Sequence, residues 1–231
     1  MNKLECRSLT KKYGAIVALD SIDLTLDSGR IVGLLGPNGS GKTTLIKIAC
    51  RLLQPTSGEL LVNGQKPGKA SKASIAYLPD RDFLPEYMKV EQLIKYYADF
   101  FKDFDATRAH DLMRSLNIDE KMLLKRLSKG NREKVQLVLT MSRQAEIYIL
   151  DEPIAGVDPA ARDFILRTII GNYEQNALVL ISTHLIADVE PYLDEIIFLK
   201  QGHIVRHGNA EETRIATGKS IDELFREEFK C

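Results

Sequence analysis

The chain has 231 residues, with 32 basic and 32 acidic side chains, so its formal net charge at pH 7 is zero. This length allows one large domain, and the charge balance argues against a nucleic-acid partner. Cys6, Cys50 and Cys231 are not spaced as metal ligands or disulfide pairs, which is typical of a reducing compartment. No apolar run approaches a span of about 18 residues, and the N-terminus lacks the apolar core of a signal peptide. We expect a cytoplasmic protein that reaches a membrane only through another chain.

The first third of the chain has mainly β-strand patterns. Residues 22–26 alternate apolar and polar side chains, and residues 59–63 form a second short strand that ends at an Asn63-Gly64 turn. Residues 31–35 are uniformly apolar, which is typical of a strand buried on both faces. A helix-compatible stretch, residues 44–53, follows after a glycine-rich segment.

The middle of the chain, residues 84–127, changes to a helical pattern. Residues 83–104 contain seven of the sixteen Tyr and Phe side chains, more than one small core needs. Two interpretations remain open, because aromatic side chains can fill the core of a helical subdomain or form a docking surface for a partner. The positions that share one helical face are Val90, Leu93, Ile94, Tyr97 and Phe101.

Beyond residue 144, strand and helix patterns alternate again. The predicted elements are strands at 147–150 and 178–182, a helix at 159–173, a hairpin of 195–199 and 203–206 around Gln201-Gly202, and a helical tail at 210–230 with a break at Thr217-Gly218. The helical middle segment is therefore an insertion within an α/β core.

A phosphate-binding pattern lies between the apolar strand and the first helix. Residues 36–43 match the P-loop pattern G-x-x-x-x-G-K-[ST] in its strand–loop–helix context. The glycines let backbone N–H groups curl toward a di- or triphosphate, and the helix N-terminus favours negative charge. Lys42 can reach the outer phosphates, and the Thr43 hydroxyl can ligate Mg²⁺. The predicted nucleotide-binding residues here are Gly36, Pro37, Asn38, Gly39, Ser40, Gly41, Lys42, Thr43 and Thr44.

An acidic pair follows the second apolar strand. Residues 147–150 lead directly into Asp151 and Glu152. With a P-loop upstream, this is the Walker B pattern, in which Asp151 holds Mg²⁺ and Glu152 polarises the attacking water. The predicted fold is α/β, with a P-loop NTPase core, a β-rich N-terminal subdomain and an inserted α-helical subdomain.

We expect a single domain over residues 1–231. The core comprises residues 1–80 and 144–231, and the helical subdomain spans approximately residues 81–143.

With these motifs in place, the chain resembles the ATP-binding cassette (ABC) ATPases, the nucleotide-binding subunits of ABC transporters, over about residues 4–208. Leu-Ser-Lys-Gly-Asn at 127–131 resembles the signature loop, and Ala-Gly-Val-Asp at 155–158 resembles the D-loop. Asp80 lies where the family usually carries the Q-loop glutamine. Tyr13 resembles the aromatic that stacks on adenine, and His184 the switch histidine.

The resemblance implies roles for these residues. His184 hydrogen-bonds the γ-phosphate and aligns the water with Glu152, so the catalytic residues are Glu152, His184 and Lys42. Ser128 and Gly130 meet the nucleotide bound by the opposite subunit of a head-to-tail dimer. ATP and Mg²⁺ are the implied cofactors, and the implied metal-binding residues are Thr43, Asp151 and Asp80.

Three positions depart from the family pattern. Asp80 replaces glutamine, and two interpretations are open: its carboxylate ligates Mg²⁺, or it caps a turn. Lys129 and Asn131 replace glycine and glutamine in the signature loop, and Ala155 replaces a common D-loop serine. None of these changes removes Lys42, Asp151, Glu152 or His184, so we expect hydrolysis to survive.

The resemblance implies an ATP-hydrolysing subunit that powers a separate transmembrane permease at the inner face of the cell membrane. Its dimer is a homodimer or a heterodimer with another ABC ATPase subunit. The chain ends soon after the last hairpin and lacks a glutamine- and arginine-rich run after Ser128, which resembles efflux-type members and favours export. The alternative is a soluble ABC ATPase that acts in macromolecular assembly, such as iron–sulfur cluster biogenesis, or on nucleic acid or the ribosome.

Overall fold

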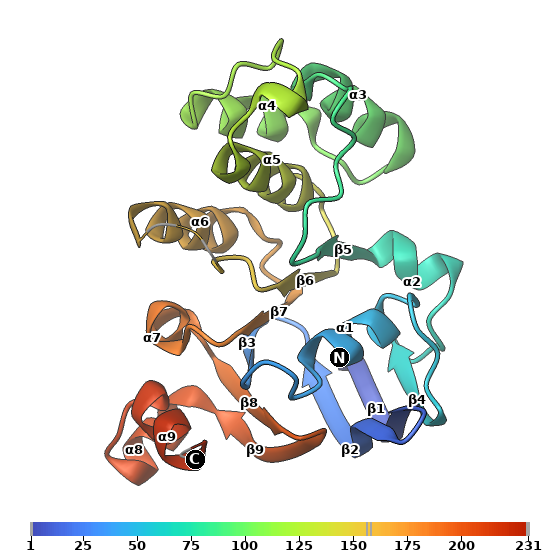
Figure 1. The fold of residues 1–231 in the computed structure, drawn as a ribbon, viewed down its shortest axis with the longest axis vertical. Coiled ribbons are helices and arrows are strands. Elements are labelled where there is room, and N and C mark those ends of the chain that lie inside the picture. The colour runs from blue at the N-terminus through green and yellow to red at the C-terminus, as the bar shows by residue number, and fades with distance from the viewer. Residues whose placement is uncertain (1, 156, 158, 230–231) are drawn as a thin grey trace.

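The computed structural model describes residues 2–155, 157 and 159–229. Its strands form two sheets, which lie in the lower and middle parts of Figure 1. The smaller sheet is antiparallel, in the order β2 (Ile16–Asp27), β1 (Asn2–Tyr13), β4 (Ser57–Val62). The larger sheet has the order β5 (Ile75–Leu78), β6 (Ile147–Asp151), β7 (Leu178–Thr183), β3 (Arg30–Leu35), β8 (Glu195–Lys200), β9 (His203–Asn209).

The larger sheet is parallel except for β9, which pairs with β8 as an antiparallel hairpin. Its register aligns Leu35 of β3 with Thr183 of β7, and Asp151 of β6 with Ser182 of β7. The carboxyl ends of β3, β6 and β7 therefore meet at one edge of the sheet. In open α/β sheets, ligands bind at this kind of edge.

Helices cover both faces of the larger sheet (Figure 1). On one face, α1 (Lys42–Ala49) packs between the two sheets, and Leu45, Ile46 and Ile48 join their buried cluster. The opposite face packs against α6 (Pro159–Asn172), α7 (Ile186–Val189) and α9 (Ile221–Glu228), together with the end of α5 (Lys129–Met141). The remaining elements of these layers are α2 (Lys69–Ser74), the 3-10 turn η2 (Glu190–Tyr192) and α8 (Ala210–Thr217).

A third apolar cluster lies apart from the two sheet faces. It is formed by α3 (Val90–Phe100), α4 (Ala106–Ser115), the 3-10 turn η1 (Leu124–Arg126) and α5, at the top of Figure 1. Val90, Leu93 and Ile94 of α3 are buried in this cluster, as their shared helical face predicted. By contrast, Tyr96 and Phe100 of the same helix are 54% and 67% exposed, so the aromatic residues serve both a core and a surface.

The predicted α/β fold is confirmed, and the structure adjusts several element limits. The first helix begins at Lys42 rather than residue 44. It ends at Ala49 rather than residue 53, because Arg51 adopts a positive φ of 54°. The sequence patterns did not single out β1 or β5 as strands. The predicted break in the C-terminal tail is confirmed, because Gly218 adopts φ 67° and ends α8. Within the described residues, no helix is both long and apolar enough to cross a membrane.

Candidate active site

The loop of residues 36–41 connects β3 to α1 through two left-handed glycines. Gly39 has φ 81° and Gly41 has φ 114°, a region that side chains disfavour. A Cβ at Gly41 would lie 2.5 Å from the carbonyl oxygen of Ala18 on β2, so only glycine fits there. The Ser40 hydroxyl is buried and has no hydrogen-bond partner among the described residues. The loop therefore packs against β2 on one side and ends at the N-terminus of α1.

Lys42 is buried at the first position of α1. Its Nζ donates hydrogen bonds to the carbonyl oxygens of Gly36, at 2.7 Å, and Pro37, at 3.2 Å, and lies 3.6 Å from Glu152 Oε1. Burial lowers the pKa of Lys42, and the neighbouring Glu152 carboxylate partly offsets this shift. The ammonium group is thus partly desolvated, and Glu152 is its anionic partner at ion-pair distance, a role that a phosphate could take over.

Asp151 is fully buried at the end of β6. The Ser182 hydroxyl donates to its Oδ1 at 2.5 Å, and the Thr43 hydroxyl donates to the same oxygen at 3.4 Å. Burial raises the pKa of Asp151, the two hydroxyl hydrogen bonds lower it, and the nearby charges of Asp80 and Glu152 raise it further. Its other oxygen, Oδ2, is buried without a hydrogen-bond partner among the described residues.

The donor set fits Mg²⁺. A buried carboxylate oxygen without a partner is costly unless it acquires a cation or a donor, and Mg²⁺ prefers oxygen ligands from one or two carboxylates, with substrate phosphates completing the shell. Asp151 and Thr43 supply such oxygens. The described residues contain no cluster of three or more His, Cys, Asp or Glu side chains that could hold a metal ion.

Asp80 is exposed just after β5, and its charge reaches Asp151 electrostatically. The turn-capping role considered for Asp80 belongs to a neighbour in this structure, because the N–H of Leu84 donates to Asp82 Oδ1 at 3.1 Å. Among the described residues, Asp80 makes no hydrogen bond. Ligation of Mg²⁺ by Asp80 therefore stays a prediction.

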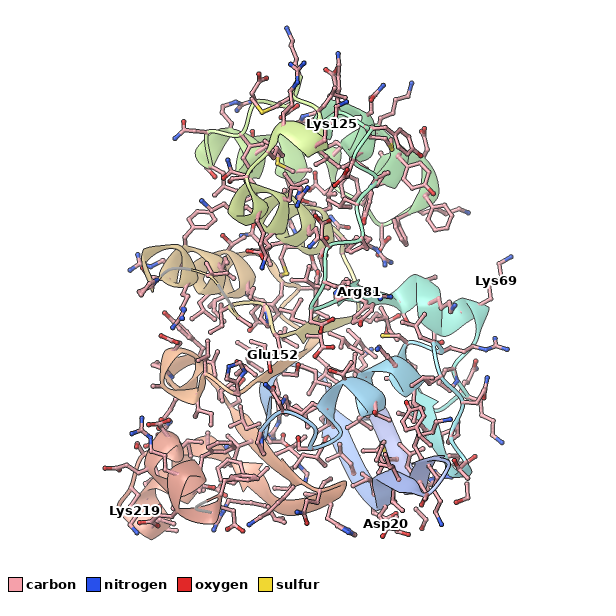
Figure 2. All side chains as sticks on the ribbon, viewed as in Figure 1. Asp20, Lys69, Arg81, Lys125, Glu152 and Lys219 are labelled. Atoms are coloured by element: carbon pink, nitrogen blue, oxygen red, sulfur yellow. The ribbon has the colours of Figure 1, made fainter. Side chains whose placement is uncertain are left out.

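Glu152 and His184 contact each other across the ends of β6 and β7. Glu152 has φ 51°, and its N–H donates to the Ser182 carbonyl oxygen at 2.9 Å, so its backbone is held in a sparsely populated region by the neighbouring strand. Nδ1 of His184 lies 3.1 and 3.0 Å from the two Glu152 carboxylate oxygens. Figure 2 shows Glu152 near the centre of the molecule, far from Lys125 and Lys219 at its outer ends.

The remaining predicted site residues lie outside this cluster. Tyr13 is 45% exposed at the end of β1, with the Lys11 ammonium 5.2 Å from its ring centroid. Its β-sheet partner Ile16 is 70% exposed, and this apolar side chain next to Tyr13 was missed by the sequence analysis. Alternation alone could not identify Ile16, because an exposed isoleucine at a hairpin end also occurs without a ligand.

Ser128 and Gly130 are exposed at the start of α5. The Ser128 hydroxyl accepts a hydrogen bond from the N–H of Asn131 at 3.2 Å and caps the helix. No hydrogen bond or ion pair among the described residues joins either residue to the P-loop. Of the predicted D-loop, Gly156 and Asp158 lie outside the described residues.

Ser182 is a further site residue that the sequence analysis did not identify. It fixes Asp151 through its hydroxyl and Glu152 through its backbone carbonyl. Its signal was a small polar residue at the end of an otherwise apolar strand, and the parallel register that pairs it with Asp151 was needed to interpret it.

These features define a P-loop nucleotide-binding site. The family model described as ABC transporter matches residues 19–155. An ABC transporter ATP-binding protein of Methanocaldococcus jannaschii is 31% identical over 219 residues, which cover 91% of this chain and 79% of that protein. A probable multidrug ABC transporter ATP-binding protein of Escherichia coli is 30% identical over 223 residues, which cover 91% of this chain and 38% of that protein.

A solved structure of the ATP-binding subunit of an ABC transporter superposes with a TM-score of 0.88 at 29% identity, and covers 99% of this chain and all of that one. The chain therefore belongs to the ABC transporter family, as one of its ATP-binding proteins. It is an ATPase coupled to transport. The predicted family, fold and enzyme class are confirmed.

Proposed function

We propose that this chain hydrolyses ATP with Lys42, Asp151, Glu152 and His184, and thereby powers a separate transmembrane permease. The observation that carries this proposal is the convergence of the four side chains at one sheet edge, where Glu152 lies within 3.6 Å of Lys42 and within 3.1 Å of His184. A carboxylate base beside a lysine and a histidine supplies groups that can orient and deprotonate water and neutralise charge on the phosphates.

Binding of ATP would reorganise this cluster. The backbone N–H groups of residues 36–43 and the N-terminus of α1 favour the phosphates, and Lys42 meets their outer oxygens. The γ-phosphate then replaces Glu152 as the anionic partner of Lys42. The carboxylate of Glu152 is thereby released to accept the proton of the attacking water.

His184 takes part in the same exchange. A neutral imidazole carries one N–H, so it cannot donate at the same time to Glu152 through Nδ1 and to a phosphate oxygen through Nε2. The γ-phosphate therefore competes with Glu152 for the proton of His184. Thr43 and Asp151 would hold Mg²⁺, which would supply positive charge to neutralise the phosphates. Asp80 adds a further carboxylate on this side.

A second ABC ATPase subunit, identical or different, would complete each site. Ser128 and Gly130 are exposed and lie apart from the cluster around Lys42. This exposure supports a head-to-tail dimer in which they meet the nucleotide on the opposite subunit. Tyr13 and Ile16 offer an apolar surface for the adenine ring. Burying ATP between subunits would make closure depend on the γ-phosphate.

A groove between α2, β5, α3 and α5 supports the permease as a partner. The groove has a volume of about 560 Å³ and is lined mostly by apolar side chains, including Leu52, Phe83 and Phe100. These three are 54%, 45% and 67% exposed, which is unusual for large apolar residues without a partner. Lys69 and Lys72 also line it, and Figure 2 shows Lys69 projecting outward from the molecule. An apolar permease segment with acidic flanking residues fits this surface.

The groove connects directly to the larger sheet. The Arg143 guanidinium lies 4.0 Å from the Phe101 ring centroid, and its Nη1 donates to the Ile75 carbonyl oxygen of β5 at 2.6 Å. We assign residues 81–143 to a helical subdomain that carries much of this surface, and residues 1–80 and 144–231 to the core. Docking would hold the chain at the cytoplasmic face of the membrane.

Export is the proposed direction. The similar Escherichia coli protein is described as a probable multidrug transporter component, and the signature region here lacks the glutamine- and arginine-rich run of importers. Co-purification of the chain with its membrane partner, followed by ATPase assay in vesicles, tests the function. ATP-dependent transport from the ATPase side outward supports it. Capture of a soluble assembly scaffold, ribosome or nucleic acid instead of a permease would contradict it.

A further inference from the structure

We propose that Arg162 is a positioning residue that fixes the segment carrying His184 against the loop that follows Glu152. Arg162 lies in the first turns of α6. Its Nε donates to the carbonyl oxygen of Val157 at 2.9 Å, and its Nη1 donates to Asp188 Oδ2 at 3.0 Å. Val157 lies in the loop between Glu152 and α6, and Asp188 lies on α7, in the segment that begins with His184.

Among the described residues, Arg162 adds a second polar connection between these two segments. The first connection is the contact between His184 Nδ1 and the Glu152 carboxylate, at 3.0 to 3.1 Å. Both segments leave adjacent parallel strands, because Asp151 and Ser182 are paired in the register of β6 and β7. Apolar packing also joins the segments, because Ile154 and Ile186 belong to one buried cluster, but such packing is not directional. The bridge from Val157 through Arg162 to Asp188 adds two directed hydrogen bonds to this packing.

The geometry of the bridge favours a guanidinium over an ammonium group. Arg162 uses two different nitrogens for its two acceptors, one a backbone carbonyl and the other a carboxylate. A guanidinium presents its donors in a rigid plane, whereas a lysine ammonium is a point charge on a flexible stem and fixes no such geometry. The Arg162 and Asp188 side chains are 25% and 36% exposed, so water only partly screens the pair.

The location of α7 depends on such contacts. The helix has only four residues, Ile186–Val189, and its N-cap Leu185 supplies no side-chain hydrogen bond. Ile186 and Val189 are buried, but apolar packing sets orientation less sharply than directed hydrogen bonds do. Asp188 is the residue of this helix through which Arg162 holds it.

The role of Arg162 rests on the proposed function of Glu152 and His184, because Arg162 itself touches neither of them. Loss of the bridge therefore misplaces the groups that activate water while the P-loop stays intact. Misplacement of catalytic groups lowers kcat more than it lowers substrate affinity.

The test compares Arg162→Met with a matched control on the same helix. Arg167 pairs with Asp163 at 3.0 Å, and both side chains are largely exposed, so Arg167→Met removes an arginine ion pair that touches neither loop. We expect Arg162→Met to lower kcat about tenfold, with the KM for ATP within about twofold. Arg162→Lys should recover part of the loss. Arg167→Met should leave kcat and KM unchanged.

A double-mutant comparison identifies the partner. Asp188→Ala should lower kcat as Arg162→Met does, and the double variant should be no slower than Arg162→Met alone, because both changes break one interaction. Independent, multiplying losses would overturn the proposal. So would a kcat for Arg162→Met within twofold of the unmodified chain, or an equal loss in Arg167→Met.

His184→Ala distinguishes failure of the proposed catalytic site from failure of the positioning role of Arg162. If His184→Ala is inactive and Arg162→Met is fully active, the site stands and the positioning role fails. If His184→Ala hydrolyses ATP at the unmodified rate, the proposed site fails, and the role of Arg162 fails with it. The melting temperature of each variant shows whether a loss of kcat reflects unfolding. If Arg162→Met is partly unfolded at the assay temperature, and its kcat returns to the unmodified value at a lower temperature where it is folded, the proposal is contradicted.

Discussion

The edge of the larger sheet and the outer surface of α3 differ in polarity and in burial. At the sheet edge, Asp151 is completely buried and Lys42 is only 5% exposed. The Asp151 carboxylate accepts from the Thr43 hydroxyl, and the Lys42 ammonium lies 3.6 Å from Glu152. On α3, Tyr96 and Phe100 expose large apolar rings. The first region concentrates charge for a small anionic ligand, and the second presents apolar area for a protein. Chemistry and coupling should therefore be separable by mutation.

The sharpest way to break this comparison is Lys42→Ala. The change removes the buried charge that meets the outer phosphates, and we expect turnover to fall about 10²–10³-fold. Steady-state ATPase assays with Lys47→Ala on the same helix as the control measure the effect. Binding to the permease should persist, because Lys42 does not line the groove. Near-normal hydrolysis by a clean preparation of Lys42→Ala would place the ATP site elsewhere.

Phe100→Ser is the converse change. Removing a 67% exposed ring from the groove should weaken binding to the permease about tenfold, because burial of an aromatic side chain often dominates an interface. ATP hydrolysis by the isolated chain should change little. Ile215→Ser on α8, where the side chain is 74% exposed, is the matched control. If both variants bind the permease in membranes equally well, the groove is not the docking site.

Variants of Asp80 test whether its carboxylate contributes to the Mg²⁺ site at the sheet edge. If its carboxylate ligates Mg²⁺, Asp80→Gln should raise the Mg²⁺ concentration for half-maximal turnover several-fold, and Asp80→Ala should raise it further, because hard cations favour anionic oxygen. The measurement is ATPase rate against Mg²⁺ at fixed ATP. A curve that is the same for all three proteins would contradict a metal role for Asp80.

Asp151→Asn separates function from stability. The pKa of buried Asp151 is raised above its unfolded value, so the unfolded chain releases this proton first as pH rises. The ionised group therefore costs stability at pH above the raised pKa, and this cost disappears below the unfolded pKa. We expect Asp151→Asn to raise the melting temperature at pH 7 without Mg²⁺ and the gain to shrink toward pH 4. A gain that grows with acidity would contradict this.

Exposed Asp163→Asn is the control for that titration, because its carboxylate is largely solvated and its ion pair lies on the surface of α6. Thermal melts of both variants across the same pH range isolate the effect of burial.

The sequence predicted the charged residues of the sheet edge better than the residues that hold them in position. The P-loop and Asp151-Glu152 could be placed because their chemistry needs fixed residue types at short spacing within one strand–loop–helix unit. Ser182 and Arg162 were not identified, because their roles come from the pairing of β6 with β7 and from the packing of α6 beside α7, both distant in sequence. The predicted end of the first helix was also wrong, since Arg51 takes a left-handed conformation that periodicity does not encode.

The central claim is that Glu152 activates water within a site closed by ATP, and Glu152→Gln tests it most directly. The amide cannot accept a proton at neutral pH, but it keeps the size of the side chain. With ATP and Mg²⁺, together with the partner ATPase subunit if the dimer is heteromeric, the variant should bind ATP, lose turnover and accumulate as an ATP-bound dimer on a sizing column. Turnover at the unmodified rate, or a species that stays monomeric with bound ATP, would contradict the account.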